Sequence, residues 1–196
     1  MNKKKKERKG IVCLCLGLLL LAGALSLTLY NLWDANRADR AAQDIVGQLK
    51  DKIQEMGDSL LSDQEMPAVE IDGNRYIGLL EIPSLELCLP VMESWDYDKL
   101  KLSPCRYSGS YFTDDLIIAG HNYIRHFGPL KSLGLGSDVY FINVQGRILH
   151  YTVDNIETLR PGQIQEMTDG DWDLTLFTCT LGGQSRCTVR CIKKDS

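Results

Sequence analysis

The sequence predicts a mainly β domain, a closed barrel or a sandwich, preceded by an N-terminal apolar helix. Between positions 75 and 196, Gly, Pro, Asn and Asp separate short β-type runs, and the one short helical candidate lies near 128–133. Many short strands in one compact segment favour a barrel or a sandwich. The runs are YIGLLEI, LELCLPVM, DLIIAGHNY, DVYFINV, RILHYTVDNIETL, DLTLFTCTL and RCTVRCIK.

Composition excludes several classes of protein. The chain has 196 residues, of which 44% are hydrophobic and 24% charged, so it is neither disordered nor fibrous. Its net charge of −4 argues against a nucleic-acid-binding protein. Residues 1–10 nevertheless carry six Lys or Arg and one Glu. A basic block this short is a tail or a topology signal.

Residues 11–33 are expected to span a membrane once. They carry no Lys, Arg, Asp or Glu, and about 20 apolar residues cross a hydrocarbon core of roughly 30 Å. The basic flank predicts a cytoplasmic tail at 1–10 and an extracellular domain beyond the span. A cleaved signal peptide is the alternative, because Ala22-Gly23-Ala24 resembles a cleavage site. The apolar run continues to Leu29, which favours a retained anchor.

Residues 34–74 are expected to form a helical stalk and a linker. One apolar stripe runs along 34–58, and Asp34 is a candidate cap for the start of this helix. Gly, Ser, Asp and Pro then predict a loop at 57–74. The β domain therefore occupies 75–196. The stripe consists of Ala42, Ile45, Val46, Leu49, Ile53 and Met56.

The cysteines and carboxylates do not suggest a metal site. Cys187 and Cys191 are four residues apart on one strand, about 13 Å, which is beyond disulfide reach, so we expect buried thiols. No C-x-x-C or H-x-x-x-H pair occurs, and zinc needs about four convergent ligands. We expect no cofactor and no metal. The carboxylates that raise the question of calcium are scattered and expected to be solvated, namely Glu157, Glu166, Asp169 and Asp171.

Among the three histidines, His121 is the candidate for chemistry. It follows an apolar strand that ends at Gly120, where a missing side chain lets the backbone turn. A histidine at a strand end is well placed to present its ring at a groove. His126 lies in a predicted loop. His150 alternates within a strand pattern and is expected to be structural or exposed.

The last two strands predict that a thiol lies beside a guanidinium. If Gly182-Gly183 forms a two-residue hairpin turn, Leu181 pairs with Gln184 and Cys179 faces Arg186. A neighbouring guanidinium favours the thiolate and can donate to a developing oxyanion. Geometry alone does not distinguish this from an incidental cross-strand pair. Arg190 shares the polar face but lies about 13 Å farther along, so we expect its substitution to be milder.

At this point the residues resemble the sortases, the cell-surface cysteine transpeptidases of Gram-positive bacteria. Residues 175–179 (TLFTC) fit the family motif T-L-x-T-C, and 116–122 (LIIAGHN) are similar to its A-G-H motif. Arg186 falls where the family places its essential arginine. The likeness covers about Arg75 to Ile192, with the motifs in the family's order; it includes YIGLLEIP at 76–83, LPV at 89–91 and CRYSG at 105–109.

The resemblance implies an eight-stranded sortase β-barrel with His121, Cys179 and Arg186 as catalytic residues. It further implies cleavage of an LPXTG-like sorting signal through a thioacyl-enzyme on Cys179, followed by transfer to a cell-wall or pilin amine. The implied partners are sorting-signal peptides of secreted proteins, an acceptor such as a peptidoglycan precursor or a pilin lysine, and membrane lipid around residues 11–33. The subclass stays open, as do a cysteine peptidase that uses water and a non-catalytic surface-binding barrel.

Overall fold

The computed structural model describes residues 3–56, 66–180 and 182–194. The chain divides into two units, Met1–Arg37 and Ala38–Ser196. Helix α1 (Lys3–Met56) begins in the first unit and ends in the second. Asp34 therefore lies within a continuous helix, and the prediction that it caps a helix start is wrong.

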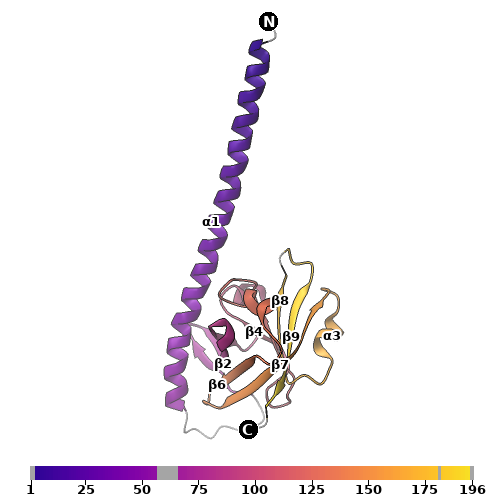
Figure 1. Ribbon diagram of the computed structural model, residues 1–196. Coiled ribbons are helices and arrows are strands. Elements are labelled where there is room, and N and C mark those ends of the chain that lie inside the picture. Colours follow the sequence, from indigo (N-terminus) through magenta and orange to yellow (C-terminus); the bar gives the residue numbers. More distant parts are fainter. Residues whose placement is uncertain (1–2, 57–65, 181, 195–196) are drawn as a thin grey trace. The chain divides into compact units, whose positions relative to one another are not determined.

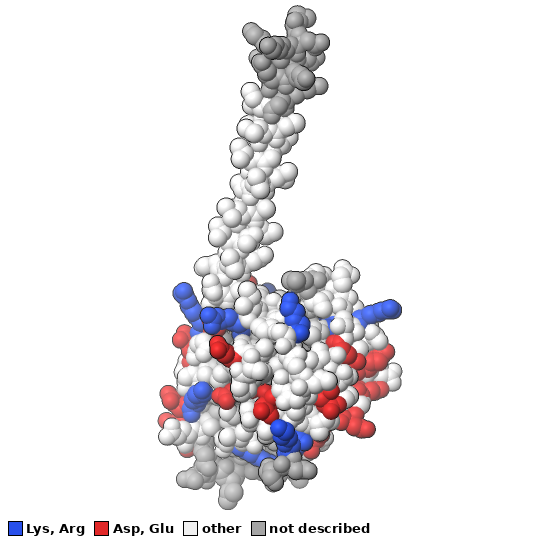
Figure 2. All heavy atoms as spheres, in the orientation of Figure 1, with Lys and Arg blue, Asp and Glu red and all other residues white. Residues whose placement is uncertain are grey.

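The first unit contains the apolar part of α1. Its side chains from Ile11 to Leu32 are mostly exposed, and Figure 2 shows no charged side chain along the described residues 11–33. The helix from Ile11 onward is long and apolar enough to cross a membrane by length and composition.

The second unit is built on a closed β-barrel (Figure 1). The strands run in the order β1-β2-β3-β4-β5-β8-β9-β7-β6, and β2 also pairs with β6, which closes a ring of eight strands. Strand β1 adds to β2 outside this ring. The strands are β1 (Val69–Ile71), β2 (Asn74–Ile82), β3 (Leu87–Met92), β4 (Cys105–Ser108), β5 (Leu116–Gly120), β6 (Asp138–Asn143), β7 (Ile148–Leu159), β8 (Leu174–Cys179) and β9 (Arg186–Lys193).

Side-chain alternation explains why these segments form a barrel. Buried and partly exposed residues alternate strictly along β6, because successive side chains of a strand point to opposite faces. The inward residues of the strands meet in one apolar cluster that includes Ile77, Phe141, Tyr151 and Val189. Where β2 is bordered by β6, a Cβ on Gly78 would lie 2.3 Å from the Ile142 carbonyl oxygen, so only glycine allows this close approach.

The end of α1 packs on the outside of the barrel. Ala42, Ile45, Val46 and Leu49 are buried, and three of them join a second apolar cluster with residues of β1, β2 and β3. This confirms the predicted stripe up to Ile53, which is partly buried against the same cluster; the side chain of Met56 lies outside the described residues. The compact unit accordingly begins at Ala38.

Several short elements were not predicted. Strand β1 lies within the expected 57–74 loop, of which residues 57–65 are outside the described part of the chain. Strand β4, helix α2 (Tyr97–Leu100) and helix α3 (Ile164–Thr168) were also missed. The helical candidate at 128–133 is confirmed as the 3-10 helix η2 (Gly128–Ser132), and the 3-10 helix η1 (Pro83–Leu85) precedes β3.

Candidate functional site

The candidate histidine and cysteine lie at the ends of two neighbouring strands, His121 directly after β5 and Cys179 as the last residue of β8. Strands β5 and β8 are parallel, with Gly120 paired to Thr178. His121 comes directly after Gly120, and Cys179 directly after Thr178. Two parallel strands in register deliver the residues that follow this pair to the same rim of the barrel.

The β8–β9 hairpin brings in the arginine. Cys179 is the register partner of Arg186, which confirms the predicted cross-strand pair. Directly opposed residues have Cβ atoms about 4.5–5.5 Å apart on one face. The turn is held by a 2.9 Å bond from the Thr180 N–H to the Ser185 carbonyl. The predicted pairing of Leu181 with Gln184 lies outside the described residues.

The Arg186 guanidinium is tied to the hairpin turn. Its Nη1 donates to the carbonyls of Gly183 and Ser185, at 3.3 and 3.2 Å. Within the described ranges no carboxylate lies within 4.0 Å of it, so its charge is not neutralised by an ion pair there. Cys179 is half-buried on the same face. The pair can therefore offer a thiol and a cation to a bound carbonyl group.

The His121 ring is oriented by its own loop. Its Nδ1 accepts a 3.1 Å hydrogen bond from the Asn122 N–H, so the neutral ring carries its proton on Nε2. The ring stacks on Tyr123, with centroids 4.2 Å apart and planes 9° from parallel. Tyr123 also contacts His126, with ring centroids 5.5 Å apart. The stack holds the His121 ring beside the strand ends.

His126 and Gly120 belong to the packing under this loop. His126 is fully buried, and burial lowers its pKa to about 4. Neither of its ring nitrogens has a hydrogen-bond partner among the described residues. A Cβ on Gly120 would lie 2.4 Å from the buried Phe127 ring. Glycine is needed here for close packing, and not for the backbone turn that the sequence suggested.

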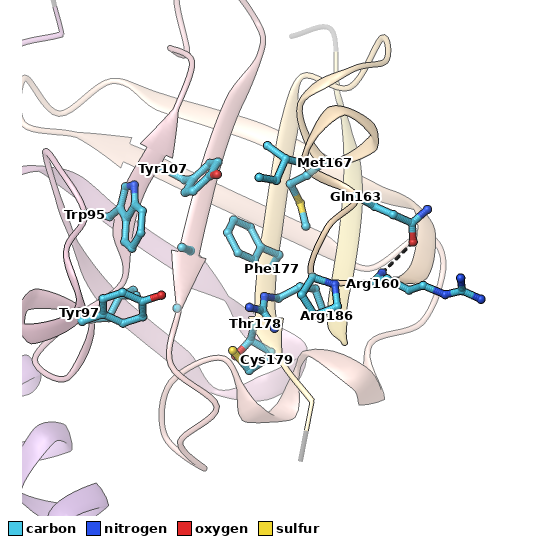
Figure 3. A pocket seen from close by; sticks show the side chains of 15 residues that line it. Trp95, Tyr97, Tyr107, Arg160, Gln163, Met167, Phe177, Thr178, Cys179 and Arg186 are labelled. Carbon is cyan, nitrogen blue, oxygen red and sulfur yellow. Dashed lines mark hydrogen bonds between the residues drawn. The ribbon is translucent and has the colours of Figure 1, made fainter. Parts of the chain in front are cut away.

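A pocket of about 210 Å³ opens beside the thiol. Figure 3 shows Cys179, Thr178 and Arg186 at one end, with aromatic side chains on one wall and Met167 and Gln163 on the other. His121 is not among the described residues that line it. The lining consists of Trp95, Tyr97, Leu100, Tyr107, Ala119, Gly120, Arg160, Pro161, Gln163, Ile164, Met167, Phe177, Thr178, Cys179 and Arg186.

The aromatic wall was missed by sequence reasoning. Tyr107 meets Phe177 edge to face at 5.3 Å, and Trp95 lies 5.5 Å from Tyr107. Phe177 precedes Cys179 by two positions, and residues two apart on a strand share a face. The sequence alone could therefore have predicted that Phe177 lies beside Cys179. Trp95 and Tyr107 come from distant segments, and only the fold brings them together.

The surroundings of Arg190 differ from the expectation. Arg190 pairs with Thr175 and lies on the same face of β9 as Arg186, as predicted. That face was expected to be polar and exposed, but around Arg190 it is buried. The Arg190 side chain is 2% exposed and forms a 2.8 Å ion pair with Glu157. Because breaking a buried ion pair leaves an uncompensated charge, this environment argues against a mild effect of substituting Arg190.

Comparisons with known proteins identify the family of this chain. The family model described as Sortase domain matches residues 80–193, more than half of the chain. The chain belongs to the sortase family. It is 26% identical to sortase A of Staphylococcus aureus over 151 residues. This match covers 72% of this chain and 73% of that protein.

Solved sortases share the fold of this sortase. Sortase C1 of Streptococcus suis is 27% identical, with a TM-score of 0.54 over 62% of this chain and 74% of its own. A Clostridium perfringens sortase C, solved with the C-terminal cell wall sorting motif, is 21% identical, with a TM-score of 0.55 over 82% and 95% of the two chains. The predicted eight-stranded sortase barrel is confirmed, and so is membership of this family of cysteine transpeptidases.

The remaining thiols of the sortase domain are less suited to nucleophilic attack. Cys105, Cys187 and Cys191 are buried and free, as predicted for the last two. Burial raises the pKa of Cys105 and of Cys191 to about 12, and also raises that of Cys187. Cys88 is half-buried, and burial raises its pKa to about 11. Since the thiolate is the nucleophile, these four groups stay protonated at neutral pH.

Proposed function

We propose that this sortase is a membrane-anchored transpeptidase that cleaves an LPXTG-like sorting signal through a thioacyl-enzyme on Cys179. The observation that carries the proposal is the pair of registers at the rim. Gly120 pairs with Thr178 and Cys179 pairs with Arg186, so His121 follows the end of β5, Cys179 ends β8 and Arg186 begins β9, on three neighbouring strands. Cys179 and Arg186 also line the apolar pocket.

In the first step the Cys179 thiol transfers its proton to His121, and the resulting thiolate attacks the carbonyl carbon of the bond to be cleaved. A tetrahedral intermediate forms, and its oxygen carries the negative charge. Arg186 donates hydrogen bonds to that oxygen, a contribution that grows as the charge develops. The intermediate collapses with cleavage of the C–N bond, and His121 gives its proton to the leaving amine.

In the second step an acceptor amine attacks the thioester carbonyl. His121, now neutral, takes the proton from this amine, and the thiolate of Cys179 leaves as the new amide bond forms. The acceptor in this proposal is a cell-wall or pilin amine.

The aromatic wall supports a peptide substrate with an apolar part. Ligand sites are mostly apolar with a few placed polar groups, and here Trp95, Tyr107 and Phe177 lie across from Met167. The apolar residues of the signal bind at this wall in our proposal. The scissile carbonyl then lies at the end that Cys179 and Arg186 line.

The anchor completes the proposal. The helix from Ile11 onward is long and apolar enough to span a membrane, and the basic residues before it keep the N-terminus inside. Residues 1–10 are then cytoplasmic, 11–33 lie in lipid, and the barrel faces secreted proteins outside the cell. A cysteine-accessibility assay on intact cells tests this orientation: barrel thiols are labelled from outside if it is correct, and only after lysis if it is not.

The test is cleavage of a fluorogenic sorting-signal peptide by the full chain, with and without an added amine nucleophile. We expect cleavage, and an amide adduct between the acyl fragment and the amine. The Cys179→Ala variant is expected to fold as the wild type and to be inactive, whereas the matched control Cys88→Ala keeps its activity. Hydrolysis unaffected by amine identifies a cysteine peptidase, and activity that survives Cys179→Ala contradicts the proposal.

A further inference from the structure

Arg190 is a buried cation that connects three segments of the barrel. From β9 its Nε donates to the Glu157 carboxylate on β7 at 2.8 Å, and Nη1 donates to the Thr175 hydroxyl on β8 at 3.0 Å. The same guanidinium donates to two main-chain carbonyls outside the strands. Nη1 reaches the Met167 oxygen at 2.9 Å, and Nη2 reaches the Glu166 oxygen at 2.5 Å.

These two carbonyls belong to the segment between β7 and β8, which contains α3. The last carbonyls of a helix have no partner within it, and a cation there is favourable. The same segment forms one wall of the pocket through Arg160, Pro161, Gln163, Ile164 and Met167. Arg190 therefore holds the backbone of the wall that faces the aromatic residues.

Asp173, at the end of this segment, accepts from the Lys193 and Leu116 N–H groups, but few other described contacts fasten the wall to the barrel. Met167 is buried, but Ile164 is exposed and the side chain of Gln163 bonds within the segment itself, to the Arg160 N–H and to Glu166. The one side-chain bond from β9 to Met167 besides those of Arg190, within the described residues, is the weak 4.0 Å contact of Thr188 with its sulfur. Segments with few buried contacts open locally at low cost.

Arg190 is too far away to take part in the chemistry directly. It pairs with Thr175, whereas Arg186 pairs with Cys179, and four residues of a strand span about 13 Å. Any effect it has on the reaction must pass through the wall that it holds.

We propose that Arg190 is a positioning residue that fixes the segment between β7 and β8 as the pocket wall, and so sets how tightly the pocket binds its peptide. The proposal rests on the proposed function for the identity of the ligand. That Arg190 restrains the segment is argued only from its hydrogen bonds to the Glu166 and Met167 carbonyls.

The critical variant is Arg190→Lys, which keeps a cation beside Glu157 but loses the planar fork that reaches both carbonyls. The matched control is Arg75→Lys, because Arg75 also forms an ion pair, with Glu93, outside the pocket lining. Hydrogen exchange of the full chain in detergent measures the restraint without any substrate. We expect amides of residues 160–173 to exchange about tenfold faster in Arg190→Lys, the effect of one lost charge-assisted bond, with β2 unchanged.

Peptide cleavage measures the consequence for binding. In Arg190→Lys we expect KM to rise about tenfold while kcat stays within about twofold, the pattern of lost uniform binding. Alkylation of Cys179 by iodoacetamide is expected to keep its wild-type rate. Arg75→Lys is expected to change none of these readouts. If Arg190→Lys does not fold, Glu157→Gln removes the negative charge of the Nε partner with Arg190 retained, and the same shifts are expected in smaller size.

If the amides of residues 160–173 exchange at the wild-type rate in folded Arg190→Lys, the proposal that Arg190 restrains this segment is wrong. If exchange is faster but KM is unchanged, the segment is restrained by Arg190 but does not set peptide binding. If Arg75→Lys shows equal changes in exchange and KM, neither effect is specific to Arg190. If the wild type cleaves no peptide, the proposed function fails, while the exchange experiment still decides whether Arg190 holds the wall.

Discussion

Acid destabilises this barrel through a buried histidine under the candidate site. His126 is fully buried, and neither ring nitrogen has a hydrogen-bond partner among the described residues. Burial disfavours the imidazolium and lowers the pKa of His126 to about 4, with a smaller contribution from His121. The unfolded chain has a histidine pKa of about 6.5. Between these two values the unfolded chain binds a proton that the folded protein does not.

The size of the effect follows from this difference. Stability is fully retained above pH 6.5 and is lost as the pH falls towards 4, because a group that is neutral only in the fold favours unfolding in acid. A difference of 2.5 pKa units corresponds to about 3 kcal/mol at most, of which about 2.5 kcal/mol is lost between pH 7.5 and pH 4.5.

The assay compares urea unfolding of the wild type and of His126→Leu at these two pH values. Other titrating groups are common to both proteins, so their contributions cancel in the comparison. At pH 7.5 the variant is expected to be at least as stable, because it removes a buried polar ring without partners in the described structure. At pH 4.5 it is expected to lose about 2.5 kcal/mol less than the wild type. Equal losses in both proteins would refute the reasoning.

Three further predictions concern the rim and the thiols. Arg186→Lys is expected to lower kcat/KM about 100-fold, nearly as much as Arg186→Ala, because Lys lacks the fork that donates twice; retention of most activity in steady-state peptide assays argues against bidentate donation. Gly120→Ala is expected to cost about 1–3 kcal/mol in urea unfolding, since its Cβ overlaps the Phe127 ring; unchanged stability shows that the ring moves freely. At pH 7, mass spectrometry of the alkylated folded barrel is expected to find Cys179 modified before Cys191, whose pKa is about 12; the reverse order contradicts the proposed nucleophile.

Strand pattern and turn chemistry predicted much of the fold. The seven strand runs correspond to β2, β3 and β5 to β9, because period-two alternation and turn residues are local signals. The pairing of Cys179 with Arg186 followed from the same local geometry. Closure through β2 and β6 is non-local, and the resemblance rather than the periodicity predicted it.

Local sequence patterns could not predict the pocket wall or the burial of Arg190. Strand β1 and helix α3 have three and five residues, too few for a periodic pattern. The alternation along β9 placed Arg190 on the correct face of the strand. Alternation does not predict which other segment covers that face. The segment between β7 and β8 covers that part of it and supplies two carbonyls to the guanidinium, so a position that looked polar is buried.

The central claim is that Cys179 carries the acyl group, and trapping this intermediate tests it most directly. The full chain is mixed with a sorting-signal peptide without an amine acceptor, quenched in acid, digested and analysed by mass spectrometry. We predict a thioester mass on the peptide that contains Cys179, lost on addition of amine and absent in Cys179→Ala. An adduct on another cysteine, or substrate turnover with no adduct on Cys179, would contradict the account.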